Sequence, residues 1–213
     1  MKSILYTYKF RIYPNSNQID KLSKSFGCVR FVYNYFLNKE KENYKINHNH
    51  LGYYENAKEL TSLKKEHIWL KECNSQSLQH SLKHLERAYT NFFEKRGELP
   101  RFKSKKNHYD SLTIPQFCTI DDKYIYFPKF NEGIRCKFHR EVIGTISTFT
   151  ITRTPTNKYY VSIQVEKDYE PLNKSIDTLD SSKSIGIDLG IENLLTLSSG
   201  DIISNNRYID VYR

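Results

Sequence analysis

Apolar and polar residues alternate along the N-terminal segment, which predicts a strand with one buried face. Its apolar positions are Ile4, Tyr6, Tyr8, Phe10 and Ile12. Pro14 ends this strand, and Asn15 or Ser16 can cap the helix that follows, with Gln18 in capping-box position after Asn15. An apolar stripe at helical spacing then runs from Ile19 to Phe36.

Two more helices are predicted after a loop at residues 43–52. The second helix passes through Ala57, Leu60 and Leu63, and the third begins at Asn74 or Ser75. The third helix has an unbroken apolar stripe: Leu78, Leu82, Leu85, Tyr89 and Phe92. Three helices with such stripes can pack into a small bundle.

The pattern changes after residue 97, where short alternating segments separated by turn residues predict strands. They are residues 112–117, 123–127, 134–138, 145–152 and 159–166. Their spacing predicts an antiparallel barrel or sandwich. The first strand has no neighbouring sheet in sequence, so we expect it to join this barrel and the helices to be an insertion.

The fold class predicted is therefore α+β, an antiparallel β-barrel with an inserted helical bundle. We expect the first barrel strand at 1–13, a helix-turn-helix-like bundle at 14–97, the rest of the barrel at 98–168 and a polar linker at 169–183. Residues 184–213 contain short strands of a further domain, whose apolar edges we expect to be exposed.

Positive charge is concentrated in the first half of the chain. The 213 residues have a net charge of +9. Residues 1–110 hold 21 Lys and Arg against 11 Asp and Glu, a net charge of +10, whereas residues 111–213 hold 12 against 13, or −1. Such asymmetry indicates a face that binds a polyanion. No apolar run reaches the roughly 20 residues of a membrane span, and the N-terminus is unlike a signal peptide, so we expect a cytoplasmic protein without membrane contact.

Two groups of basic residues are candidates for nucleic-acid binding. Arg101, Lys103, Lys105 and Lys106 surround Phe102 in an extended segment, where cations can follow phosphates and the ring can stack. On the third helix, Gln79, Lys83 and Arg87 recur every four residues and can face a groove. Lys21, Lys24 and Arg30 lie off the apolar stripe of the first helix.

No zinc site or disulfide framework is expected. The four cysteines include no C-x-x-C pair and are interpreted as free thiols. His80 and His84 have the spacing of a two-histidine metal site, but no third ligand is evident.

Asp188 lies within an apolar strand-like segment, where burying an unpaired carboxylate is unfavourable. Two-metal phosphodiester hydrolysis would use such a carboxylate but needs several converging on the ions. The segment "GIDLG" followed by a hairpin also fits the phosphate-binding hairpin of the actin and heat-shock ATPases. Asp188 alone does not decide between a nuclease and an actin-like ATPase fragment.

Several segments in order resemble the TnpB (OrfB) proteins of insertion sequences, which are related to type V CRISPR nucleases. They are "YKFRIYPNSNQIDKLSKSFGCVRFVYNYFLN", "LKECNSQSLQHSLKHLERAYTNFFEK", "LPRFKSKK", "YIYFPKF", "GTISTFTITRTPTNKYYVSIQVE" and "IGIDLGIENLLTLSSG". The resemblance runs from about Tyr6 to the end of the sequence.

The resemblance implies a wedge β-barrel with an inserted recognition bundle, followed by an RNase H-like RuvC domain. It also implies Mg²⁺-dependent DNA cleavage guided by an RNA from the transposon end, on double-stranded DNA with a short target-adjacent motif. Asp188 matches the first RuvC carboxylate and metal ligand. Tyr53, Ser75 and Gln79 match positions that read the target-adjacent motif.

This sequence departs from the family pattern because it contains only the first RuvC motif. The later glutamate motif, the zinc-binding insertion and the third carboxylate motif do not occur in it. We therefore expect nucleic-acid binding without DNA cleavage by this chain alone, and leave open whether it is an enzyme. The alternative within the same resemblance is a non-catalytic RNA-guided DNA-binding repressor.

Overall fold

The computed structural model describes residues 2–107, 110–169 and 181–206, which fall into two compact units. Unit 1 is Met1–Tyr169 and unit 2 is Glu170–Arg213. The predicted linker at 169–183 lies mostly outside the described residues. Within the described ranges, no helix is both long and apolar enough to cross a membrane.

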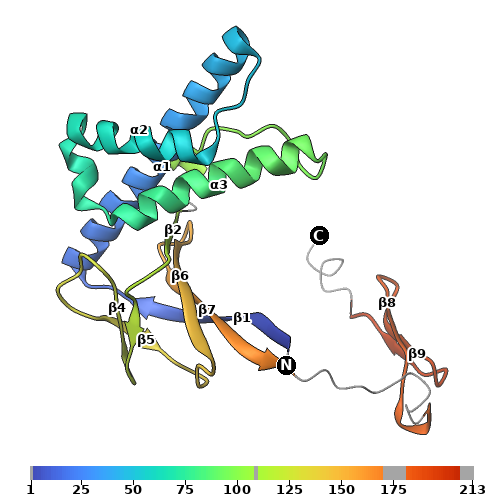
Figure 1. Cartoon of the computed structure of the whole chain (residues 1–213). Helices are drawn as coiled ribbons and strands as arrows, with labels where there is room; N and C mark the ends of the chain where they lie inside the picture. The colour runs from blue at the N-terminus through green and yellow to red at the C-terminus, as the bar shows by residue number, and fades with distance from the viewer. Residues whose placement is uncertain (1, 108–109, 170–180, 207–213) are drawn as a thin grey trace. The chain divides into compact units, whose positions relative to one another are not determined.

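Unit 1 contains a seven-stranded antiparallel sheet and three α-helices (Figure 1). Its helical elements are α1 (Ser16–Asn47), α2 (Tyr53–Glu66), the 3₁₀ turn η1 (Ile68–Glu72), α3 (Ser75–Phe93) and the 3₁₀ turn η2 (Lys105–Asn107). Its strands are β1 (Lys2–Tyr13), β2 (Asp110–Ile114), β3 (Thr119–Ile120), β4 (Tyr124–Tyr126), β5 (Ile134–Lys137), β6 (Thr145–Arg153) and β7 (Tyr159–Tyr169). The α+β class predicted from the sequence is confirmed.

The strand order places β1 in the middle of the sheet. The order is β2-β6-β7-β1-β5-β4-β3, and β1 pairs with β7 from Lys2↔Tyr169 to Ile12↔Tyr159. The helices are therefore inserted between a central strand and the strands that follow it in sequence. Among the described residues the edge strands β2 and β3 are not paired with each other, so no strand ladder between them closes the sheet into the predicted barrel.

Side chains from the sheet and the helices form one hydrophobic core in unit 1. Phe10 and Phe149 come from strands, and Leu22 and Phe36 come from α1; each is at most 1% exposed. Both α1 and α3 pack against β2. This shared core fixes the orientation of the α1 and α3 surfaces relative to the sheet.

The start of α1 agrees with the sequence prediction, but its end does not. Asn15 caps the helix and forms the expected capping box with Gln18. The predicted loop at 43–52 is wrong in its first half, because α1 continues to Asn47 and ends at His48, whose φ is 49°. No Pro or Gly occurs between Gly27 and His48, so nothing in the sequence ends the helix before that point. Buried Glu40, near the end of the helix, accepts hydrogen bonds from Asn56 and His50.

Unit 2 contains a three-stranded antiparallel sheet, β8 (Ile187–Leu189), β9 (Asn193–Leu197) and β10 (Ile202–Ser204), after the 3₁₀ turn η4 (Ser181–Lys183). β9 is the central strand. Large apolar side chains on this sheet are exposed, including Ile187 and Leu189 at 59% and 75%. The expected exposure of apolar residues in this segment is therefore observed.

Candidate nucleic-acid interface

Three polar residues on α3 form an exposed row, as their four-residue spacing predicts. Gln79, Lys83 and Arg87 are all exposed. The Lys83 ammonium lies 5.7 Å from the centre of the Tyr53 ring, which comes from the start of α2. Tyr53, Lys83 and Arg87 also line one cavity of about 340 Å³. The structure thus brings together candidates that are thirty residues apart in sequence.

Ser75 lies at the first position of α3. It is exposed, and its hydroxyl accepts a hydrogen bond of 2.6 Å from the ammonium of Lys64 on α2. Its neighbour Gln76 donates a 2.7 Å hydrogen bond to Gln116 in the loop after β2. The N-terminal end of α3 is therefore connected both to α2 and to the sheet.

The basic loop, defined here as residues 101–106, is fixed to α1. The side chain of Asn34 bonds both the backbone N–H and the backbone carbonyl of Lys103, at 2.8 and 2.9 Å. The Lys103 ammonium lies 4.1 Å from the centre of the Tyr33 ring, and loss of water there lowers its pKa. Lys41 lies over the Phe102 ring at 4.6 Å. These contacts hold the loop against the helix with its cations in place.

The remaining candidates in the basic loop point into solvent. Arg101 is exposed and pairs with Glu98, which is also exposed. Lys105 and Lys106 are exposed in η2. Exposed ammonium and guanidinium groups at these positions are free to follow a phosphate backbone.

Arg30 has a structural partner that sequence reasoning missed. Its guanidinium donates a 2.7 Å hydrogen bond to buried Asp110, which also accepts from Arg153 of β6. The Asp110 side chain is only 6% exposed, so two cations offset one buried carboxylate. This cluster joins α1 to β2 and β6. Arg30 remains a predicted nucleic-acid contact, but its charge is already partly offset within the protein.

His80 and His84 are neighbours on α3, with ring centres 4.5 Å apart. Burial, the neighbouring His80 ring and the nearby cations Lys103 and Arg87 lower the pKa of His84 to about 4. Burial and Lys83 also lower the pKa of His80. Both rings are therefore neutral at pH 7, in a neighbourhood that is strongly positive.

Asp188 lies on β8, opposite Thr196 of β9, and is exposed. The predicted strand is present in the structure, and the carboxylate on it faces solvent. Its strand neighbours Ile187 and Leu189 are 59% and 75% exposed, so the described residues of unit 2 do not cover it with an apolar layer. In the described part of the chain, no three His, Cys, Asp or Glu side chains converge in a way that could hold a metal ion. The residues present around Asp188 therefore do not fit a two-metal site.

Comparison with known proteins gives matches in sequence over nearly the whole chain. A family model described as "Helix-turn-helix domain" (HTH_OrfB_IS605) matches residues 1–49. In the structure, residues 2–49 contain β1 and the single long helix α1.

Two curated relatives are similar over almost all of this chain. "Putative RNA-guided DNA endonuclease InsQ" of Escherichia coli (strain K12) is 35% identical over 93% of this chain and 48% of its own length. "Putative RNA-guided DNA endonuclease" of Streptomyces pristinaespiralis is 31% identical over 98% of this chain and 52% of its own length. The chain thus spans about half the length of these relatives.

Two further matches are shorter or weaker. "Virulence protein VsdF" of Salmonella dublin is 32% identical over 46% of this chain and 91% of its own length. The "Cryo-EM structure of the Cas12f1-sgRNA-target DNA complex" covers 98% of this chain and 59% of that chain, at 12% identity and a TM-score of 0.39. A TM-score at that level supports no argument about this chain.

Proposed function

Because the chain belongs to the TnpB (OrfB) family, we propose that it is the nucleic-acid-binding N-terminal part of a transposon-encoded RNA-guided DNA endonuclease. Its proposed partners are a guide RNA from the transposon end and double-stranded DNA with a short target-adjacent motif. The observation that carries the proposal is the fixed position of two basic surfaces on unit 1, the α3 row and the basic loop.

The α3 row and the basic loop would bind the phosphate backbone. Lys83, Arg87, Lys103, Lys105 and Lys106 supply the cations, and neutralising phosphates releases counterions. Because Asn34 holds the basic loop, little ordering is needed when a polyanion arrives. Tyr53, Ser75 and Gln79 are proposed to read the target-adjacent motif, since hydroxyl and amide groups can bond base edges.

We further propose that this chain does not cut DNA by itself. A two-metal nuclease site needs several carboxylates, and Asp188 is exposed without such a group around it in the described residues. In a longer protein with the remaining carboxylates, Asp188 would be a ligand of Mg²⁺. No catalytic step follows from the residues that this chain contributes.

The binding proposal is tested by titrating the chain into fluorescein-labelled transposon-end RNA at several salt concentrations. We expect log affinity to fall linearly with log salt, with a slope that reports several phosphate contacts. Lys83→Ala and Arg87→Ala should each reduce that slope by about 1. Lys58→Ala, at an exposed position on α2, is the control and should leave the slope unchanged. A salt-independent affinity, or no binding, would refute the proposal.

A further inference from the structure

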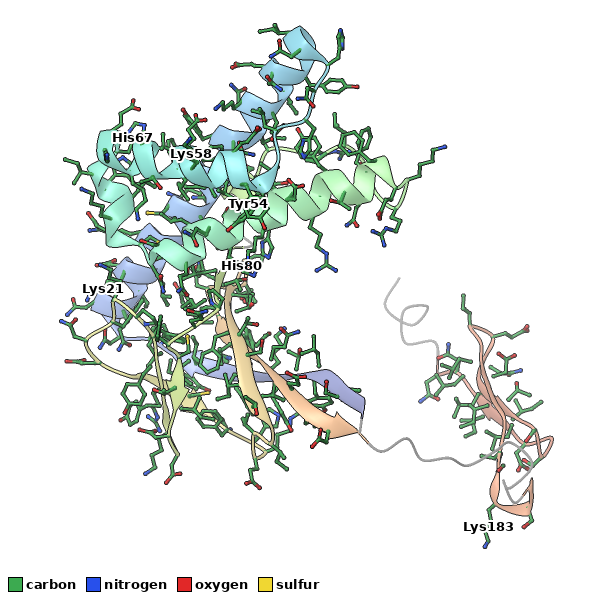
Figure 2. The ribbon with its side chains drawn as sticks, in the orientation of Figure 1. Lys21, Tyr54, Lys58, His67, His80 and Lys183 are labelled. Carbon is green, nitrogen blue, oxygen red and sulfur yellow. The ribbon has the colours of Figure 1, made fainter. Side chains whose placement is uncertain are left out.

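A cavity of about 260 Å³ lies between α1, η1 and the loop after β4. Four lysines from three separate segments line it: Lys21, Lys24, Lys71 and Lys129. Glu72 is the acidic residue in the lining and pairs with Lys24 at 3.1 Å, which leaves a net charge of +3. We call this cavity the lysine pocket; Lys21 is labelled in Figure 2, on the part of α1 near the loops of the sheet.

A buried hydroxyl without a partner lies in the lining of the lysine pocket. Ser77 of α3 is 2% exposed, and its Oγ has no hydrogen-bond partner among the described residues. A buried polar group that stays unpaired is unfavourable, so its presence indicates a ligand or water that satisfies it. The combination of this hydroxyl with excess lysines favours an anion with several oxygen acceptors, such as a phosphodiester.

Two residues, one in the lining of the lysine pocket and one in the loop after β2, have backbone conformations that their side chains disfavour. Phe117, in the loop after β2, has a φ of 61°, and Lys129, in the pocket lining, has a φ of 73°. Glycine or asparagine is the usual residue at such a φ. Residues held in sparsely populated backbone regions cluster at binding sites, where the side chain is needed in that direction.

Phe117 presents an exposed aromatic ring in the loop after β2, three residues beyond Ile114 of the pocket lining. Its side chain is 78% exposed, so it contributes little to the core. Its loop is joined to the pocket by two routes. Ile114, three residues earlier, lines the pocket, and Gln116 accepts the hydrogen bond from Gln76, which is next to Ser77.

We propose that the lysine pocket and Phe117 together bind one unpaired nucleotide of a nucleic-acid strand. The phosphate occupies the pocket beside Lys21, Lys71, Lys129 and the Ser77 hydroxyl, and the base stacks on the Phe117 ring. This inference rests on the proposed nucleic-acid-binding function and adds a site separate from the α3 row and the basic loop. Stacking on an aromatic ring tolerates any base, so the site would select an unpaired base without a sequence preference.

The test compares oligonucleotides with and without bases. Affinities of the whole chain are measured for fluorescein-labelled single-stranded DNA and RNA of mixed sequence, and for an abasic deoxyribose-phosphate strand of the same length. Phe117→Gly should weaken binding to the base-bearing strands about tenfold, and leave the abasic strand unaffected. Lys129→Gly and Ser77→Ala should weaken binding to all three strands, since both remove contacts to phosphate.

Stability measurements separate a binding role from a structural one. Phe117→Gly and Lys129→Gly keep the left-handed conformation but remove the steric cost of a side chain there, so their Tm should be unchanged or a few degrees higher. Lys95→Gly is the matched control, because Lys95 has a φ of 59° and lies just after α3, outside the pocket lining. It should match Lys129→Gly in Tm while keeping the affinity near that of the unchanged chain.

Several outcomes would overturn the inference. Equal loss of affinity for base-bearing and abasic strands in Phe117→Gly would exclude stacking on that ring. Equal losses of affinity in Lys129→Gly and Lys95→Gly would show that Lys129 acts only through its general surface charge and not as part of a phosphate site. Nucleic-acid binding that is insensitive to all these variants would refute this site alone, whereas absence of any binding would refute the proposed function itself.

Discussion

The two units use their apolar residues in opposite ways. In unit 1, Phe36 and Phe149 are fully buried between helices and sheet. In unit 2, large apolar side chains of β8 are exposed, with Ile187 at 59% and Leu189 at 75%. Unit 1 therefore has the core that a stable binding surface needs, whereas the described strands of unit 2 do not form a buried core among themselves.

The largest expected effect is on the free energy of unfolding, and it differs between a buried position in unit 1 and an exposed position in unit 2. Phe36→Ala should lower the free energy of unfolding of unit 1 by about 3–5 kcal/mol, because it leaves a cavity in the core. Leu189→Ala on β8 should change it by less than about 0.5 kcal/mol, since that side chain is exposed. Urea titration followed by the fluorescence of Trp69, the single tryptophan and a residue of η1, reports on unit 1. Similar losses in the two variants would contradict the comparison.

A second, smaller effect is expected at the cluster that joins helix to sheet within unit 1. Asp110→Asn removes the charge that Arg30 and Arg153 share, which leaves two mostly buried guanidinium groups unpaired. The expected loss is about 3 kcal/mol in the same urea titration. Glu98→Gln removes the exposed partner of Arg101 and is the control, with an expected change below about 0.5 kcal/mol. Equal effects in these two variants would show that the Asp110 cluster has no special role.

The smallest expected effect is a pH dependence of the stability of unit 1. The pKa of His84 is lowered in the folded chain to about 4, so between pH 6.5 and 4 the unfolded chain binds the proton and the folded chain does not. Stability is therefore lost as pH falls through this window. His84→Gln should flatten that part of the Tm-versus-pH curve. An unchanged slope in His84→Gln would contradict the environment described for this ring.

Local sequence signals predicted the parts of unit 1 that depend on neighbouring residues. Asn15 and Gln18 specified the start of α1, because a capping box is a local pattern. Alternation in the first strand predicted a buried face, and Phe10 and Ile12 are each 1% exposed. These features need no information from distant parts of the chain.

The features that were missed depend on contacts between distant segments. Asp110 meets Arg30 and Arg153 only after β2 packs against α1 and β6. The positive φ of Phe117 and Lys129 has no local signal, because both residue types disfavour that conformation. The lysine pocket likewise combines residues more than one hundred positions apart.

The predictions of site residues also divide into those with a local signal in the sequence and those that depend on contacts between distant segments. Gln79, Lys83 and Arg87 were grouped correctly as one exposed row because helical spacing is local. The contact of Lys83 with Tyr53 and the attachment of Lys103 to Asn34 required the tertiary structure. Whether these residues contact nucleic acid stays a prediction.

The most direct test of the central claim is a combined binding and cleavage assay. The chain is incubated with transposon-end guide RNA, matched double-stranded DNA and Mg²⁺, and both the bound fraction and the DNA products are measured. We predict salt-sensitive binding with intact DNA, and the same result for Asp188→Ala. DNA cleavage by this chain that disappears in Asp188→Ala would contradict the account.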